Sequence, residues 1–144
     1  MPRRKKNRIV CNPPLYTEFK PVGIRSRQLA RTVLTLDEYE AVRLADGLRM
    51  SHADAAEEME ISRSTFTRLI EQARRKVADF LTTGKLLCVS GGNIHFRRNI
   101  IRCLNCGHMF NTELSSSPAE CPSCGSETLV DLAGGFGHGK CCIR

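Results

Sequence analysis

The longest helical pattern in this 144-residue chain runs from Thr35 to Gly84 and reads TLDEYEAVRLADGLRMSHADAAEEMEISRSTFTRLIEQARRKVADFLTTG. Three residues of the N-cap type, Thr35, Ser51 and Ser62, divide it, and Glu38 completes a capping box with the first. Gly84 has the residue type that commonly follows a helix C-terminus. We therefore expect three helices, over about residues 36–45, 52–59 and 63–81.

The third of these helices has one apolar face and one basic, polar face. Its apolar residues follow the i, i+3, i+4, i+7 spacing of a buried helix face: Phe66, Leu69, Ile70, Ala73, Val77, Phe80 and Leu81. Short polar and arginine side chains at the start of such a helix can reach base edges in the major groove. We predict base or near-base contacts from Arg63, Ser64, Thr67 and Arg68. We predict phosphate contacts from Arg74, Arg75 and Lys76.

The second predicted helix is short, and Glu60–Ser62 leaves room only for a tight turn before the third. Helix-turn-helix units pack in this way. The alternative is a three-helix bundle whose basic face is only solvated. We favour double-stranded DNA as the partner.

Two parts of this segment resemble the sigma-factor region 4 helix-turn-helix, residues 36–51 for its first half and residues 55–66 with 73–77 for its second. The wider pattern resembles a family of small, uncharacterised prokaryotic proteins predicted to bind DNA, over about residues 1–96. Its features are a basic start, Pro13-Pro14, Lys20-Pro21-x-Gly23, the helical segment, Gly84-Lys85-x-Leu87 and Gly91-Gly92. The resemblance implies a DNA-binding domain without a known target.

The basic residues of the chain are concentrated at its start. The whole chain has a net charge of +7, and residues 1–31 hold nine Lys or Arg residues against the single acid Glu18. Such an arm is typical of contact with a polyanion, although a solvated tail has the same composition. We expect this proline-punctuated segment to be extended or irregular. The predicted phosphate or minor-groove contacts of the arm are Arg3, Arg4, Lys5, Lys6 and Arg8.

Two Cys-x-x-Cys-Gly units follow the helical segment, and their ligands would be Cys103, Cys106, Cys121 and Cys124. Facing each other, two such units form a closed tetrahedral site of four thiolates, which is structural because it leaves no open position. Short strands at Asn99–Arg102 and Met109–Thr112 would make this segment a zinc ribbon. We favour Zn²⁺, and the alternative is a rubredoxin-like iron site with the same ligands.

The chain ends in a Gly-rich tail that carries His138, Cys141 and Cys142. One interpretation is that these residues bind a soft metal or sense redox state, and the other is that they belong to a flexible end without a specific role. We favour the flexible end, because three ligands do not complete a metal site.

Together these patterns predict a mainly α fold, with a three-helix helix-turn-helix domain, a short β-hairpin over residues 85–97 and a small β-rich zinc ribbon. The expected organisation is a basic arm at 1–31, the DNA-binding domain at 32–97, the four-cysteine module at 98–132 and the tail at 133–144. No apolar run approaches the roughly 18 residues of a membrane span, and no signal sequence is recognisable. We therefore expect a cytoplasmic protein.

The predicted function is sequence-specific DNA binding in transcription regulation, and a homodimer would fit a palindromic DNA site. One alternative is a zinc-ribbon adaptor that binds RNA polymerase or another protein. Another is an iron electron carrier. We expect no enzymatic activity, because the sequence has no nucleophile elbow and no phosphate loop.

Overall fold

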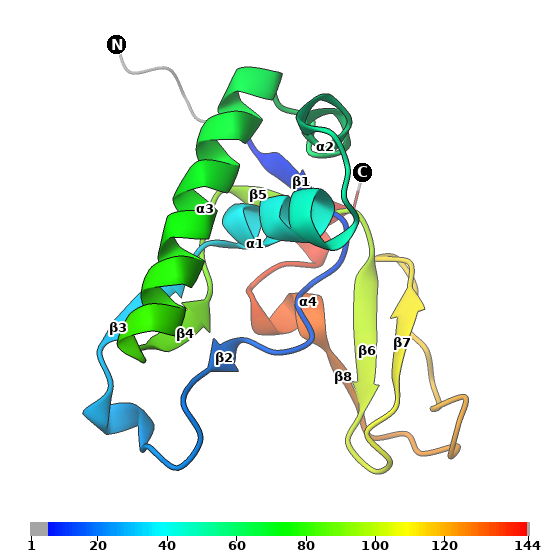
Figure 1. The fold of residues 1–144 in the computed structure, drawn as a ribbon. Helices are drawn as coiled ribbons and strands as arrows, with labels where there is room; N and C mark the ends of the chain where they lie inside the picture. The colour runs from blue at the N-terminus through cyan, green and yellow to red at the C-terminus, as the bar shows by residue number, and fades with distance from the viewer. Residues whose placement is uncertain (1–5, 144) are drawn as a thin grey trace. The chain divides into compact units, whose positions relative to one another are not determined.

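The structure, a computed structural model, describes residues 6–143 (Figure 1). The chain divides into two compact units. The first unit consists of Met1–Ile9 and Tyr16–Ile94, and the second of Val10–Leu15 and His95–Arg144. Strand β1 (Arg8–Val10) pairs with β5 (Ile94–Phe96), and the border between the units falls within both strands. The chain therefore passes from one unit to the other at each of these strands.

The fold class predicted from the sequence is wrong. Residues 6–143 contain four α-helices, the last of only four residues, and eight strands in three small sheets. The protein is thus a mixed α/β protein, and neither the mainly α class nor the three-helix helix-turn-helix domain with a separate β-rich zinc ribbon describes it.

The hairpin expected over residues 85–97 is replaced by pairing with distant strands. β4 (Leu86–Val89) pairs with β2 (Glu18–Phe19) and β3 (Arg31–Leu34), while β5 pairs with β1. These partners come largely from the proline-punctuated start of the chain, where an extended or irregular structure was expected. Their short strands give little local signal, because pairing and burial rather than backbone preference decide whether such segments become strands.

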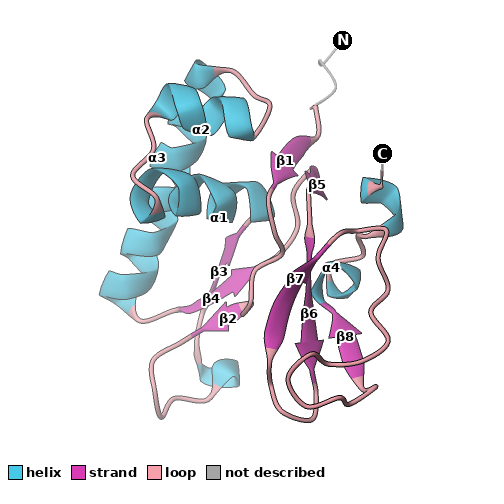
Figure 2. Cartoon of the chain, turned by 90° about the vertical axis from the view of Figure 1, so that its right-hand side faces the viewer, coloured by secondary structure: helices cyan, strands magenta, loops and turns pink. Residues whose placement is uncertain are grey.

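The sheet of the first unit explains the place of its helices (Figure 2). β3 runs parallel to β4, with Leu34 opposite Val89, while β2 runs antiparallel to β4. Two parallel neighbours need a crossover connection. Here the crossover is the whole helical segment, namely α1 (Leu36–Val42), α2 (His52–Glu58) and α3 (Arg63–Thr83).

The three predicted helix starts are confirmed. Thr35, Ser51 and Ser62 are the N-cap residues of α1, α2 and α3. The Ser51 hydroxyl accepts a hydrogen bond from the Asp54 N–H at 3.1 Å, and the Ser62 hydroxyl accepts one from the Thr65 N–H at 3.2 Å. α1 continues into a π-helical turn (Arg43–Gly47), and α3 ends before Gly84, whose φ of 68° is left-handed.

The core of the first unit lies where these helices meet. Phe66 and Ile70 of α3 are fully buried in one cluster with Ala55 and Met59 from the α2 segment and with Leu44 of the π-helical turn that follows α1. This is the apolar face that the i, i+3, i+4 spacing predicted. Its burial orients α3 so that the opposite face meets solvent.

A tight approach of Gly92 to α1 leads to a first prediction. Gly92 has a φ of 101°, and a Cβ added there would lie 3.0 Å from Oδ1 of the buried Asp37. Gly91 also has a positive φ, of 76°, but an added Cβ would meet no atom within 4 Å. Gly91→Ala should therefore cost about 1 kcal/mol of unfolding free energy from backbone strain alone, and Gly92→Ala measurably more. Urea unfolding of both variants measures the difference, and equal losses would contradict the close contact.

The second unit is built on an antiparallel sheet of order β7-β6-β8 (Figure 2). Its strands are β6 (Asn99–Cys103), β7 (Met109–Thr112) and β8 (Leu129–Asp131), followed by α4 (Leu132–Gly135) and the 3₁₀ turn η3 (Lys140–Cys142). The first unit has a comparable short turn, η1 (Ser26–Gln28). The strands expected beside the first cysteine pair are thus present. Among residues 6–143, no helix is both long enough and apolar enough to span a bilayer.

Candidate metal centre and nucleic-acid surface

The two Cys-x-x-Cys-Gly units form nearly identical turns. The N–H of Cys103 donates to the carbonyl of His108 at 2.9 Å, and the N–H of Cys121 donates to that of Ser126 at 2.9 Å. Each turn is closed by the glycine N–H, which donates to the carbonyl of the first cysteine of its pair. Gly107 and Gly125 have φ values of 77° and 74°, a conformation that glycine adopts without strain.

The turns bring the four predicted ligands together, with all four sulfur atoms within 4.8 Å of one another. Sγ of Cys103 lies 3.6 Å from Sγ of Cys124, and Sγ of Cys106 lies 3.7 Å from Sγ of Cys121. A tetrahedral ion with metal–sulfur bonds of about 2.3 Å requires sulfur–sulfur edges of about 3.8 Å. The donor set therefore fits a tetrahedral thiolate-bound metal ion.

The surroundings of the sulfur atoms lower the pKa of two thiols and raise that of a third. The Asn105 side chain, which donates to Sγ of Cys124 at 3.5 Å, and the Ser126 backbone lower the pKa of Cys124 to about 6. The backbone N–H of Cys106 likewise lowers the pKa of Cys103. The backbone N–H of His108 also lowers the pKa of Cys106, but desolvation and the neighbouring sulfur atoms outweigh it and raise that pKa to about 11.

The tail residues His138, Cys141 and Cys142 lie together with a fourth residue, His95 of β5. The tail contains α4 and η3, and the N–H of His138 donates to the carbonyl of Ala133 at 3.0 Å. Burial lowers the pKa of His138 and raises the pKa of the Cys142 thiol. His95 was not predicted as a ligand, because it is separated from the tail by more than forty residues and belongs to a strand pattern.

Seven of the twelve predicted DNA contacts lie on α3. Arg63, Ser64, Arg68 and Arg75 are exposed. Thr67 is half-buried, and its hydroxyl lies 3.0 Å from Nδ1 of His52. The structure therefore places the four predicted near-base residues on the first two turns of one helix.

Three of the predicted phosphate contacts have carboxylate partners. Arg8 pairs with Asp37 at 2.5 Å and Lys76 pairs with Glu38 at 2.6 Å, and both acids are buried. Arg74 makes two hydrogen bonds, at 2.6 and 3.1 Å, to the carboxylate of Asp46, and these bonds lower the pKa of Asp46. These three cations neutralise acidic groups of the fold.

A cavity of about 400 Å³ lies beside α3 in the first unit. Four of its lining residues are basic, namely Lys6, Arg8, Arg68 and Lys76, and two are acidic, namely Asp37 and Glu38. Thr65 and Gln72 of α3 also line it. Neither was predicted as a contact, although their helical spacing from Arg68 places them on the same face. Lys6 is exposed, whereas the predicted contacts Arg3, Arg4 and Lys5 lie outside the described residues.

Comparison with known proteins shows that this chain has close relatives. It is 47% identical to a UPF0251 protein of Chloroherpeton thalassium over 132 residues, covering 92% of this chain and 87% of the relative. It is 43% identical to a UPF0251 protein of Moorella thermoacetica over 141 residues, covering 98% and 93%. It is also 39% identical to the UPF0251 protein CT1277 of Chlorobaculum tepidum over 145 residues, covering 97% and 74%. No solved structure matches the chain.

These relatives cover both cysteine pairs, whereas the family model that matches the chain covers residues 1–97, up to the end of β5. That model is described as protein of unknown function DUF134. The chain therefore belongs to the DUF134 family of UPF0251 proteins.

Proposed function

We propose that this protein binds double-stranded DNA through the exposed face of α3 and acts in transcription regulation. The observation that carries the proposal is the arrangement of α3, whose apolar face is buried while Arg63, Ser64 and Arg68 face solvent on its first two turns. Arginine and small hydroxyl side chains read base edges in the major groove. Exposed Arg68 and Lys6 also line the cavity beside this face.

The connection between α2 and α3 supports the same proposal. The N–H of Ile61 donates to the carbonyl of Ala56 at 3.0 Å, and Glu60 adopts a left-handed φ of 54°. This tight turn holds α3 against α2 at its N-terminal end, which is the end that enters the groove in helix-turn-helix proteins. The pair of helices resembles those motifs, here as part of the crossover of an α/β unit.

The test begins with selection of bound sequences from a random DNA pool by full-length, metal-replete protein at near-physiological salt. We expect an enriched motif, and two half-sites about one helical turn apart would support a homodimer. Arg68→Ala should then weaken binding to the selected sequence by roughly 10- to 100-fold, because a bidentate base contact contributes about 1–3 kcal/mol. Binding to unrelated DNA should change far less. Fluorescence anisotropy with both DNAs measures the ratio.

Lys85→Ala is the matched control, since Lys85 lies beyond the C-terminal end of α3 and pairs with Asp79 at 2.6 Å. It should leave both affinities within about twofold, whereas Lys6→Ala should weaken both and flatten their salt dependence. If Arg68→Ala lowered the affinity for the selected sequence and for unrelated DNA equally, α3 would not contact the bases. Retention of DNA without an enriched motif would instead favour the alternative adaptor that binds a protein partner such as RNA polymerase.

Within this proposal the four-cysteine site holds Zn²⁺ as a structural ion, and the protein catalyses no reaction. Four thiolates occupy every position of a tetrahedral ion, so that no place remains for a substrate or water. A colourless protein with bound zinc would support this assignment. A red protein would support the iron alternative, because iron–thiolate centres absorb visible light. Since its ligand is DNA, we place the protein in the cytoplasm of the prokaryotic cell.

A further inference from the structure

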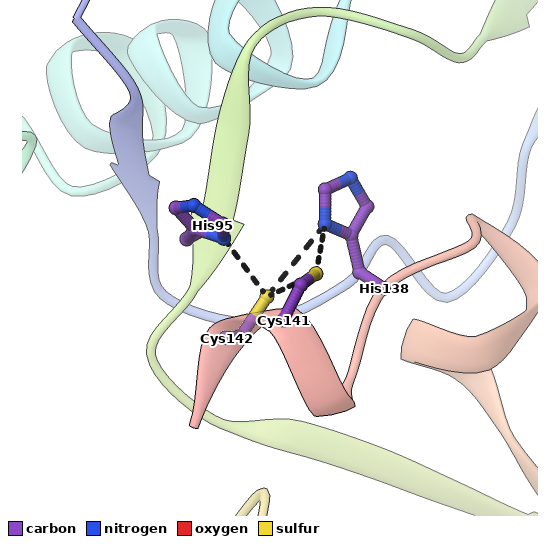
Figure 3. A group of neighbouring side chains, drawn as sticks. All are labelled: His95, His138, Cys141 and Cys142. Carbon is purple, nitrogen blue, oxygen red and sulfur yellow. Dashed lines mark hydrogen bonds between the residues drawn. The ribbon is translucent and has the colours of Figure 1, made fainter. Parts of the chain in front are cut away.

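A second group of potential metal ligands lies in the second unit, separate from the four-cysteine site. His95, His138, Cys141 and Cys142 point toward one another, and their donor atoms all lie within 4.8 Å of one another (Figure 3). His95 comes from β5, whereas the other three come from the turn after α4 and from η3. Two segments far apart in the sequence thus meet at one point.

The distances centre on the sulfur of Cys142. It lies 3.5 Å from Nδ1 of His95, 3.6 Å from Nδ1 of His138 and 3.7 Å from Sγ of Cys141. Sγ of Cys141 lies 3.3 Å from Nδ1 of His138. With metal–sulfur bonds of about 2.3 Å and metal–nitrogen bonds of about 2.0–2.1 Å, a tetrahedral ion requires sulfur–nitrogen edges of about 3.6 Å and sulfur–sulfur edges of about 3.8 Å. The three edges at Sγ of Cys142 match this requirement, and the edge between Cys141 and His138 is somewhat shorter.

A network of ordinary hydrogen bonds explains this convergence less well. A thiol has one proton to donate and its sulfur is a weak acceptor. Sγ of Cys142 nevertheless lies near Nδ1 of His95, Nδ1 of His138 and Sγ of Cys141, and it also accepts a hydrogen bond from the backbone N–H of Phe96 at 3.2 Å. Backbone N–H donors of this kind stabilise a thiolate, which is the form that binds a metal.

We propose that His95, His138, Cys141 and Cys142 form a second metal site for a borderline divalent ion of the Zn²⁺ type. Two thiolates and two neutral imidazoles are a common tetrahedral donor set for zinc, and their charge balances that of the ion. Cys142 is buried and the histidines are half-buried, whereas Cys141 is exposed. The proposed ion therefore has one solvent-exposed ligand, Cys141, whereas the four-cysteine site has two, Cys106 and Cys124.

The fold positions these ligands before an ion binds. The His138 ring meets Phe96 edge-on, with ring centroids 5.5 Å apart. Gly139 is buried with a φ of 126°, and its carbonyl accepts the N–H of Cys142 at 3.1 Å. The turn thus aims both cysteines at the histidines, and ligand atoms placed in advance reduce the entropy cost of binding.

The test measures bound metal in the full-length protein, purified under thiol-reducing conditions from zinc-supplemented cells. We expect two zinc ions per chain by elemental analysis, and one in the double variant His138→Ala/Cys141→Ala. Cys88→Ser, which removes a half-buried cysteine of β4 outside both groups, should retain two. One zinc in the wild-type protein, or two in the double variant, would overturn the proposal.

Cobalt substitution distinguishes the loss of one site from the loss of all metal through misfolding, because the absorption counts the thiolates bound to Co²⁺. In the Co²⁺-loaded wild-type protein, the sulfur-to-cobalt absorption should correspond to six thiolates per chain. It should fall to the intensity of four in the double variant. A wild-type spectrum of four thiolates alone would overturn the second site and leave the four-cysteine centre unaffected.

Discussion

Replacing Cys103 with serine should unfold the second unit while the first unit stays folded. Cys103 ends β6, is fully buried, and supplies one sulfur of the four-cysteine site. Structural zinc contributes on the order of 10–16 kcal/mol to the folding of small zinc domains at pH 7. The three-stranded sheet that this site closes has few buried apolar side chains to compensate for the loss of the ion. In two-dimensional ¹H–¹⁵N NMR spectra, the backbone amide signals of β6, β7 and β8 should move to the chemical shifts of an unfolded chain.

The signals of α1, α2 and α3 should keep their dispersion, because these helices share a core of their own. Cys88→Ser is again the matched control and should leave both sets of signals in place. A Cys103→Ser protein with native signals in β6–β8 and unchanged metal content would show that the four thiols do not hold the unit together.

Replacing Phe66 with alanine should remove about 3–5 kcal/mol from the unfolding free energy of the first unit. The ring of Phe66 has 0% exposed surface, and it packs against Ala55, Met59 and Ile70. It also meets the His52 ring edge-on, with ring centroids 5.3 Å apart. Since a domain of this kind has a total stability of about 5–15 kcal/mol, the loss should be evident as a lower urea midpoint.

Leu81→Ala is the control on the same helix, because Leu81 belongs to the same periodic pattern but is 71% exposed. It should change the unfolding free energy by less than about 0.5 kcal/mol. A loss below about 1 kcal/mol from Phe66→Ala would mean that the α2–α3 contact is not the centre of the core.

The helices and the four-cysteine ligands were predictable because their signals are local. Ser62 and Gly84 mark the ends of α3 through bonds made within a few residues, and Cys103 and Cys106 lie in one turn. The residue spacing could not predict that acidic residues of α1 are buried and paired with cations. The capping box predicts the pairing of Glu38 with Thr35, but not that Glu38 is buried or that it accepts a hydrogen bond from Lys76, which is 38 residues away.

The sheets and the second ligand group depend on partners that are distant in the sequence. Arg31 lies opposite Leu86 across the whole helical segment, and nothing near either residue indicates that pairing. His95 alternates with Ile94 and Phe96 as any strand residue would, so its place beside the tail became visible only in three dimensions. Recognising a mixed α/β fold required these long-range pairs, which the strong helical periodicity obscured.

The division of the second unit between two stretches of chain has a consequence for its synthesis. Val10, Pro13 and Pro14 belong to this unit and are buried in the folded protein, but residues 16–94 leave the ribosome before His95 does. The apolar side chains of residues 10–15 therefore stay exposed to solvent until the helical segment and the rest of the second unit have been translated. A fragment that begins at residue 98 would hold all six proposed cysteine ligands but lack His95 and this early segment. A fragment that starts at His95, with residues 10–15 joined to its C-terminal end, would contain both stretches of the second unit.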